Sequence, residues 1–148
     1  MKIVILSHGK YVTTDKHYYP NGTVKSECWY LNEKKHREGD LPAYIKYNEN
    51  GTVKSECWYL NGQKHREGDL PAFIQYYRNT QRIKSVVWVK FDEIHRDEDL
   101  PALIQYFKTG EYIAKIWFVN GLKIGSQYNN RQIGEDEYES DEYESDEN

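Results

Sequence analysis

Apolar and polar residues alternate along residues 53–60 with the period of two that is typical of a β-strand. One side of this segment is apolar or small and consists of Val53, Ser55, Cys57 and Tyr59. The other side is amphipathic and consists of Lys54, Glu56, Trp58 and Leu60. We expect the first side to be buried, because the equivalent positions in later copies of the segment are also apolar or small. Helical spacing of apolar residues is absent.

A turn and a second strand follow the first. The dipeptide Asn61-Gly62 is a sequence that readily adopts the tight turn of a hairpin. The charged segment after it leads to Pro71, which cannot donate a ladder hydrogen bond and therefore indicates a strand start or a bulge. A second strand is predicted over 70–76, and its apolar side consists of Leu70, Ala72, Ile74 and Tyr76.

This pair of strands recurs along the chain. The segment 36–43 returns almost unchanged as 65–72 and 95–102. The register is marked by tryptophans with spacings of 29, 30 and 29 residues, namely Trp29, Trp58, Trp88 and Trp117. Self-similarity at a fixed period indicates units that bury apolar surface against their neighbours. We therefore predict an all-β protein, an elongated antiparallel meander of stacked β-hairpin repeats.

The repeats divide the chain into three regions. Residues 1–17 are predicted to form an N-terminal cap strand, and 18–125 three full repeats and one partial repeat. Residues 126–148 form a C-terminal extension, which we expect to be acidic and disordered from about residue 135. From residue 135 onward the chain carries nine carboxylates and no Lys or Arg, so residues 1–134 have a net charge of +5 although the whole chain has −4. Ser140 and Ser145 lie among the tail carboxylates and are candidate phosphorylation sites.

The expected location is intracellular. No apolar run approaches the roughly 18 residues that cross a bilayer, and residues 1–6 are too short for a signal peptide. We expect a protein that is neither secreted nor transmembrane. Cys28 and Cys57 occupy the same position in successive units, roughly 10 Å apart if each unit is a hairpin. That separation exceeds the reach of a disulfide, so buried free thiols are predicted.

The repeated histidines do not predict a metal site. His36, His65 and His95 would stand one unit apart, too far to share one zinc ion. We expect the His-Arg pairs to bond locally with the Glu or Asp that follows. The aspartates before Leu-Pro are expected to bond nearby backbone amides, and they are Asp40, Asp69 and Asp99. No nucleophile elbow, phosphate loop or triad spacing occurs, so no catalytic residue, metal or cofactor is predicted.

The aromatic column is the candidate binding face. We place Tyr44 and Phe73, with Leu103, on strands that face the four tryptophans. Lys25, Lys54 and Lys84 are expected to line up beside the tryptophan column. Two interpretations remain open: the rings cover the sheet, or they form a groove that binds a peptide or partner. The lysines would suit an acidic ligand, but the chain lacks a concentrated basic patch, so nucleic acid is not an expected partner.

The units resemble those of MORN proteins (membrane occupation and recognition nexus). The resemblance covers 18–125 and is carried by Glu27–Asn32 and Glu56–Gly62, with a Trp- and Tyr-rich strand before an Asn or Asn-Gly turn. The longer period and the insert that begins His-Arg resemble the MORN-like repeats of giant DNA viruses of amoebae. The resemblance implies an elongated curved sheet, a non-catalytic scaffold role, frequent self-association and, for a viral protein, a host cytoplasmic location.

We therefore expect a non-enzymatic repeat scaffold that mediates protein–protein interaction and self-associates as a homodimer or other homo-oligomer. One alternative is a peripheral module that binds lipid head groups, to which the lysine column would contribute. Another is a binder of basic, histone-like proteins through the acidic tail. The identity of the protein partner does not follow from the sequence.

Overall fold

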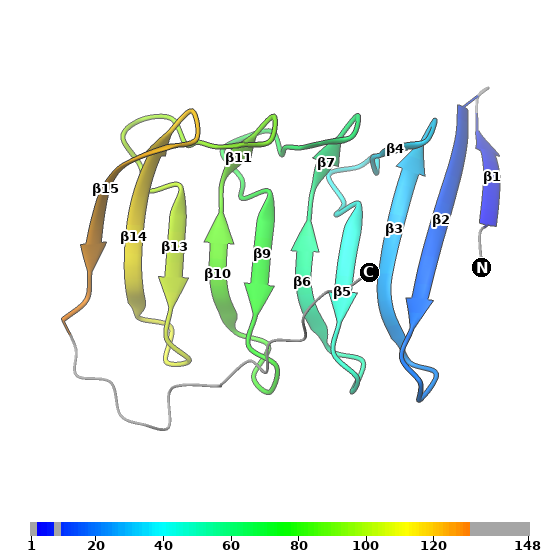
Figure 1. Ribbon diagram of the computed structural model, residues 1–148, viewed down its shortest axis with the longest axis horizontal. Helices are drawn as coiled ribbons and strands as arrows, with labels where there is room; N and C mark the ends of the chain where they lie inside the picture. The colour runs from blue at the N-terminus through cyan, green and yellow to red at the C-terminus, as the bar shows by residue number, and fades with distance from the viewer. Residues whose placement is uncertain (1–2, 8–9, 131–148) are drawn as a thin grey trace.

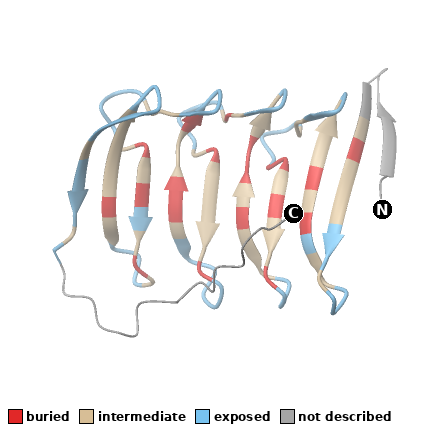
Figure 2. Cartoon of the chain, viewed as in Figure 1, coloured by how far each residue is buried: buried red, intermediate tan, exposed pale blue. Residues whose placement is uncertain are grey.

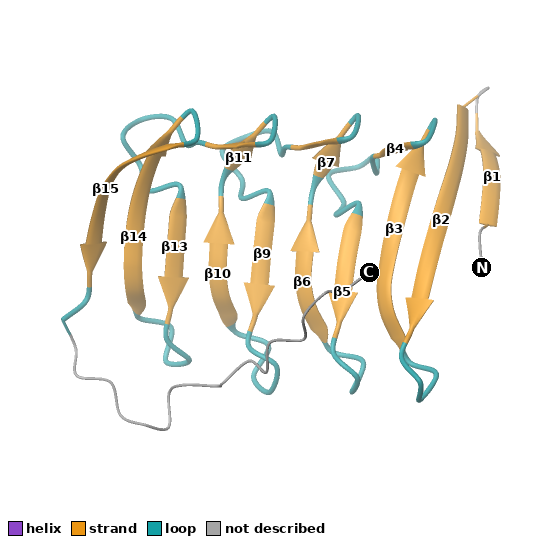
Figure 3. Cartoon of the chain, in the orientation of Figure 1, coloured by secondary structure: helices purple, strands orange, loops and turns teal. Residues whose placement is uncertain are grey.

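The computed structural model describes residues 3–7 and 10–130. The acidic tail and its two serines lie outside these residues. Within them the chain contains strands and loops and no helix (Figure 3). All strand pairs are antiparallel, and the strand order of the main sheet is β1-β2-β3-β5-β6-β9-β10-β13-β14-β15 (Figure 1). The predicted meander of stacked hairpins is confirmed, and equivalent positions of successive units lie two strands apart.

The main strands of the three full repeats come in pairs. They are β3 (Val24–Leu31) with β5 (Tyr44–Tyr47), β6 (Val53–Cys57) with β9 (Phe73–Tyr76), and β10 (Ile83–Val87) with β13 (Leu103–Tyr106). Along the chain, one or two short strands lie between the two members of each pair. They are β4 (Lys34–Lys35), β7 (Tyr59–Leu60), β8 (Gln63–Lys64), β11 (Val89–Lys90) and β12 (Glu93–Ile94).

The two ends of the sheet differ from the prediction. The region expected to form one cap strand contains two, β1 (Ile3–Ser7) and β2 (Lys10–Tyr18), and β2 pairs with the first repeat. At the other end β14 (Tyr112–Val119) pairs with β15 (Leu122–Tyr128), which continues past the predicted limit of the repeats. The outer edge of β15 pairs with no other described strand.

The first strand of each middle unit bends at its tryptophan. The Trp58 amide donates to the Ala72 carbonyl at 2.9 Å, and the Trp58 carbonyl accepts from the His65 amide at 3.2 Å. Beyond this point the chain leaves the main sheet and forms the small hairpin β7–β8. Such hairpins follow one another along the upper rim in Figure 1, and the Gly62 amide donates to the Lys35 carbonyl of the preceding unit at 2.8 Å.

The predicted Asn61-Gly62 turn is confirmed. Both residues have positive φ, 51° and 95°, as a two-residue hairpin turn with the right twist requires. In the next unit Phe91 and Asp92 take the same turn at φ 50° and 70°, although a bulky residue rarely adopts this conformation. The turn is therefore imposed by the repeat, whether or not the local residues favour it.

The fold has a thin core. Buried residues occur on both sides of the sheet, for example Cys28 on one side and Ile45 on the other. They lie mostly in the strands between the two ends of the sheet (Figure 2). The completely buried residues are alanines, Ala43, Ala72, Ala102 and Ala114, because a single sheet buries fully only what lies against its backbone. One small cluster consists of Trp58, Ala72 and Val89, with Ile74 and Val87 packed against it. Most other side chains on the described strands are half-buried, so both faces of the sheet are accessible surfaces.

Candidate binding face

Each His-Arg insert contains an arginine that stacks on the tryptophan of its own unit. We use insert for residues 36–43, 65–72 and 95–102. The Arg66 guanidinium carbon lies 3.9 Å from the centroid of the Trp58 ring, and Nη1 donates to the Pro71 carbonyl at 3.3 Å. The same contacts recur for Arg37 with Trp29 and Pro42, and for Arg96 with Trp88 and Pro101.

Two of these arginines, Arg66 and Arg96, also tie their unit to the preceding one. Arg66 donates from Nε and Nη2 to the two carboxylate oxygens of Asp40, both at 2.8 Å. Arg96 binds Asp69 in the same way, at 2.8 and 2.9 Å. We call Asp40 and Asp69 the inter-unit aspartates. Hydrogen bonding to the arginine holds the pKa of each below its ordinary value.

The tryptophan indoles add a second inter-unit bond. Trp58 Nε1 donates to the backbone carbonyl of Asp40 at 3.1 Å, and Trp88 Nε1 donates to that of Asp69 at 3.1 Å. Trp117 Nε1 donates to the Asp99 carbonyl at 2.8 Å. Each of these tryptophans is therefore anchored to the preceding unit by its polar edge.

The expected partners of the arginines and aspartates were wrong. The arginines do not pair with the local Glu, and the inter-unit aspartates accept from guanidinium groups where backbone amides were predicted. A guanidinium offers two parallel charged donors, which a carboxylate binds more strongly than it binds a neutral amide. The stack on tryptophan directs these donors toward the preceding unit.

The histidines do pair locally, as predicted for the second and third units. His65 Nε2 lies 2.9 Å from Glu67 Oε1, and His95 Nε2 lies 2.8 Å from Asp97 Oδ1. The His65 ring also stacks on Phe91, with centroids 4.2 Å apart. Within residues 3–7 and 10–130, no three His, Cys, Asp or Glu side chains come together in a way that could hold a metal ion.

A cavity of about 100 Å³ lies between the second and third inserts. Several ionisable groups that line it pair with one another, as in Arg96–Asp69, His65–Glu67 and His95–Asp97, and Arg66 pairs with Asp40. The arginines cover one face of the Trp29, Trp58 and Trp88 rings. This geometry favours the interpretation that the tryptophan column covers the sheet and joins its units.

The predicted positions of the three lysines beside the tryptophans were wrong. The strand register skips Lys25, Lys54 and Lys84, so each is the extra residue of a β-bulge. A bulge interrupts the alternation of side chains and redirects them. Lys25 and Lys54 consequently line a cavity together with Ser26, which belongs to the side of the sheet opposite Glu27.

Tyr44 and Phe73 also lie on the side opposite the predicted one. Tyr44 is directly opposite both Cys28 and Cys57, and Phe73 is directly opposite Cys57. Directly opposite residues of antiparallel strands share a face, so these rings lie with the cysteines. Leu103, opposite Ile116, does the same. We call this side of the sheet, defined by Cys28, Tyr44, Cys57 and Phe73, the lysine face.

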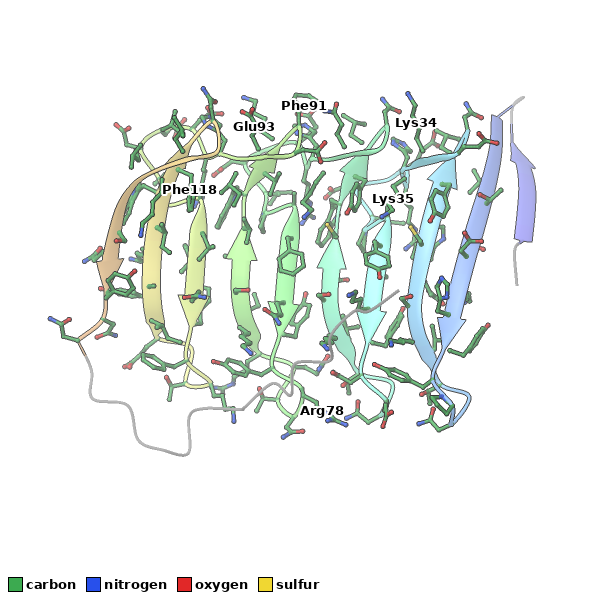
Figure 4. All side chains as sticks on the ribbon, in the orientation of Figure 1. Lys34, Lys35, Arg78, Phe91, Glu93 and Phe118 are labelled. Carbon is green, nitrogen blue, oxygen red and sulfur yellow. The ribbon has the colours of Figure 1, made fainter. Side chains whose placement is uncertain are left out.

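Lysine ammonium groups lie over the aromatic rings of the lysine face. Lys35 Nζ is 5.3 Å from the Tyr44 ring centroid and 5.1 Å from that of Tyr59 (Figure 4). Lys46 Nζ is 5.9 Å from the Tyr44 centroid, and Lys64 Nζ is 5.8 Å from that of Phe73. These distances are within the range of cation–π attraction. Lys35, Lys46 and Lys64 were not among the predicted residues, because their contacts with the rings depend on how the strands pair.

The two faces differ in charge. Among the paired residues of the main sheet that the structure describes, Asp15 is the one carboxylate on the lysine face. On the opposite face Glu27 pairs with Lys16 and accepts from the Tyr47 hydroxyl, and Glu56 accepts from the Tyr76 hydroxyl at 2.7 Å. Lysines therefore lie on the lysine face with one paired carboxylate, whereas the two glutamates of the opposite face are hydrogen-bonded within the protein.

The cysteines are buried free thiols, as predicted. Tyr44 lies between them in the register, which places them two strands apart. Burial raises the pKa of both thiols, so they are neutral near pH 7. Their place is structural, beneath the aromatic rings of the lysine face.

Comparisons with protein-family models, with curated proteins and with solved structures return no match. Within the described residues, no helix is long and apolar enough to span a membrane.

Proposed function

We propose that this protein is a non-enzymatic repeat scaffold whose lysine face binds an acidic segment of another protein. The observation that supports this most is the uneven distribution of charge. On the lysine face, lysines lie over aromatic rings, and Asp15 is the one carboxylate among the described residues in its strand register. On the other face, the glutamates bond to lysine and tyrosine side chains of this chain.

The composition of the face suits such a partner. Tyr44, Tyr59 and Phe73 are half-buried rings that offer apolar contact, and aromatic residues are the common anchors of protein interfaces. The ammonium groups of Lys35 and Lys64 are held above these rings, where they can meet carboxylates. Complementary charge of this kind contributes to association rate and to partner choice.

Two adjacent lysines provide a matched test. Lys35 lies over the rings of the lysine face, whereas Lys34 lies on the upper rim (Figure 4). Lys34→Gln and Lys35→Gln change the net charge equally. Binding of a fluorescent peptide rich in Glu, Asp and Tyr to the full chain can be followed by anisotropy in dilute salt.

We expect Lys35→Gln to weaken binding roughly threefold, which is about 0.7 kcal/mol, and Lys34→Gln to change it less than twofold. A basic peptide of equal length is the control for nonspecific association. Equal effects of the two substitutions would mean that only net charge matters. Absence of peptide binding would overturn the proposal, and co-flotation with anionic liposomes in that case would favour the lipid head-group alternative.

Self-association is a second proposed activity, and it is carried by the outer edge of β15. This edge pairs with no described strand, and Leu122, Ile124 and Tyr128 are 72%, 60% and 57% exposed. An open strand edge with apolar side chains is a template for pairing with another chain. Molar mass from light scattering should exceed that of one chain, and Ile124→Lys should return it to the monomer value. A wild-type monomer at 100 µM would remove this proposal.

A further inference from the structure

A cavity of about 120 Å³ opens on the lysine face at the first repeat. Three lysines line it together with one serine and three tyrosines: Lys25, Lys46, Lys54, Ser26, Tyr19, Tyr44 and Tyr47. We call it the three-lysine cavity. No described carboxylate lines it.

Strand register brings the three lysines together. Lys46 on β5 lies directly opposite Ser26 on β3 and Ser55 on β6. Lys25 and Lys54 are the bulge residues that precede these two serines. Neighbouring strands are about 4.8 Å apart, so Lys46 has a lysine one strand away on each side.

The first repeat differs from its copies at the central position. Gln75 and Gln105 stand where the first repeat has Lys46, and they occupy the same register between serine or alanine neighbours. Lys54 and Lys84 flank Gln75, so the second repeat has a similar arrangement without the central charge. The chain therefore contains its own control for the contribution of Lys46.

The cavity is prepared for an anion. Three ammonium groups from neighbouring strands offer several charged donors to a single anion. Aromatic rings hold two of the ammonium groups in place, with Lys25 Nζ 5.6 Å from the Tyr19 centroid and Lys46 Nζ 5.9 Å from the Tyr44 centroid. The Tyr19 hydroxyl donates to the Tyr47 carbonyl at 2.8 Å, which fixes that wall of the cavity.

We propose that the three-lysine cavity binds the phosphate of a phosphorylated side chain carried by the acidic segment that docks on the lysine face. A phosphate monoester carries nearly two negative charges and three acceptor oxygens at pH 7, which match three ammonium groups better than one carboxylate does. The inference rests on the proposed function and adds the chemical group that the first repeat selects.

The test uses the full chain and two tyrosine-containing acidic peptides that differ only in phosphorylation of the tyrosine. Their affinities are measured for the wild type and for Lys46→Gln. This substitution gives the first repeat the glutamine that the second and third repeats have at the equivalent position. We expect the phosphorylated peptide to bind wild type roughly tenfold more tightly than its partner. Lys46→Gln should abolish most of this preference while changing binding of the unphosphorylated peptide less than threefold.

A variant with an added lysine and the amide chemical shifts of the wild type test where the phosphorylated peptide binds. Gln75→Lys should add a second site for the phosphorylated peptide, and the shift changes in wild type should centre on Ser26 and Lys46. Lys34→Gln is the control for net charge, and thermal melting confirms that each variant is folded.

The outcomes separate this inference from the proposed function. Equal binding of the two peptides overturns the phosphate site and leaves the acidic-segment proposal standing. Absence of binding by either peptide overturns both. Binding of vesicles that carry a phosphorylated lipid head group, with no binding of the phosphorylated peptide, also overturns the inference and assigns the cavity to a membrane ligand.

Discussion

Replacing Arg66 with methionine tests how the repeats are joined. Methionine keeps an unbranched apolar stem but removes the guanidinium that pairs with Asp40 and stacks on Trp58. The matched control is Arg37→Met in the first repeat. Arg37 makes the same stack on Trp29, but no carboxylate among the described residues pairs with it. The difference between the two variants therefore isolates the inter-unit ion pair.

The expected loss of stability depends on how far the ion pair is exposed to solvent. The Asp40 side chain is 54% exposed, so its bidentate pair with Arg66 is screened by solvent and contributes about 0.5–1 kcal/mol. The stack on tryptophan contributes about 0.5–1 kcal/mol in either repeat. Arg66→Met should therefore lower the free energy of unfolding by about 1–2 kcal/mol, and Arg37→Met by about 0.5–1 kcal/mol.

Urea unfolding followed by tryptophan fluorescence measures these values. A double-mutant cycle with Asp40→Asn gives the coupling directly, and asparagine tolerates the φ of 53° at this position. We expect a coupling of about 0.5–1 kcal/mol for Arg66 and none for Arg37. Arg96→Met, with its partner Asp69, is the replicate that controls for position along the array. Added salt at 0.5 M should shrink the coupling.

Equal losses for Arg37→Met and Arg66→Met would refute the reasoning. So would a coupling between Arg66 and Asp40 below about 0.2 kcal/mol in dilute salt, because the pair would then contribute nothing to the array.

Three further predictions concern the inter-unit aspartates, the buried cysteines and Gly125. The lowered pKa of the inter-unit aspartates stabilises the fold above the ordinary Asp pKa of about 3.9, and this stability is lost as pH falls through their folded-state pKa. The urea midpoint should therefore fall between pH 5 and pH 2, and less steeply in Asp40→Asn; identical slopes would contradict this. The raised pKa of both buried cysteines predicts slow labelling by a thiol reagent at pH 8 and fast labelling in urea, so rapid labelling of the native protein would oppose it. Gly125 is directly opposite Trp117 and stands where the other repeats have arginine. The arginine of Gly125→Arg should therefore pair with Asp99 and raise the free energy of unfolding in urea by about 0.5 kcal/mol. Gly125→Met is its control, and an equal gain there would exclude the ion pair.

The sequence was sufficient to predict the architecture because the patterns that specify it are local and repeated. Alternation along residues 53–60, the Asn61-Gly62 turn and the tryptophan spacing each predict hairpins without knowledge of distant contacts. The same spacing places equivalent residues two strands apart, and the free thiols of Cys28 and Cys57 follow from that distance. These properties depend on backbone geometry that every copy of the repeat shares.

The distribution of charge between the two faces was decided by tertiary structure. A bulge shifts Lys25 and Lys54 relative to simple alternation, and nothing in the local pattern marks which residue the ladder will skip. The choice of Asp40 over a local glutamate as the partner of Arg66 depends on where the Trp58 ring directs the guanidinium. Side-chain direction at a bulge and the partner of a long side chain are set by neighbouring strands and units. The sequence alone therefore predicts the order and pairing of the strands, and only the folded chain determines which face carries the lysines.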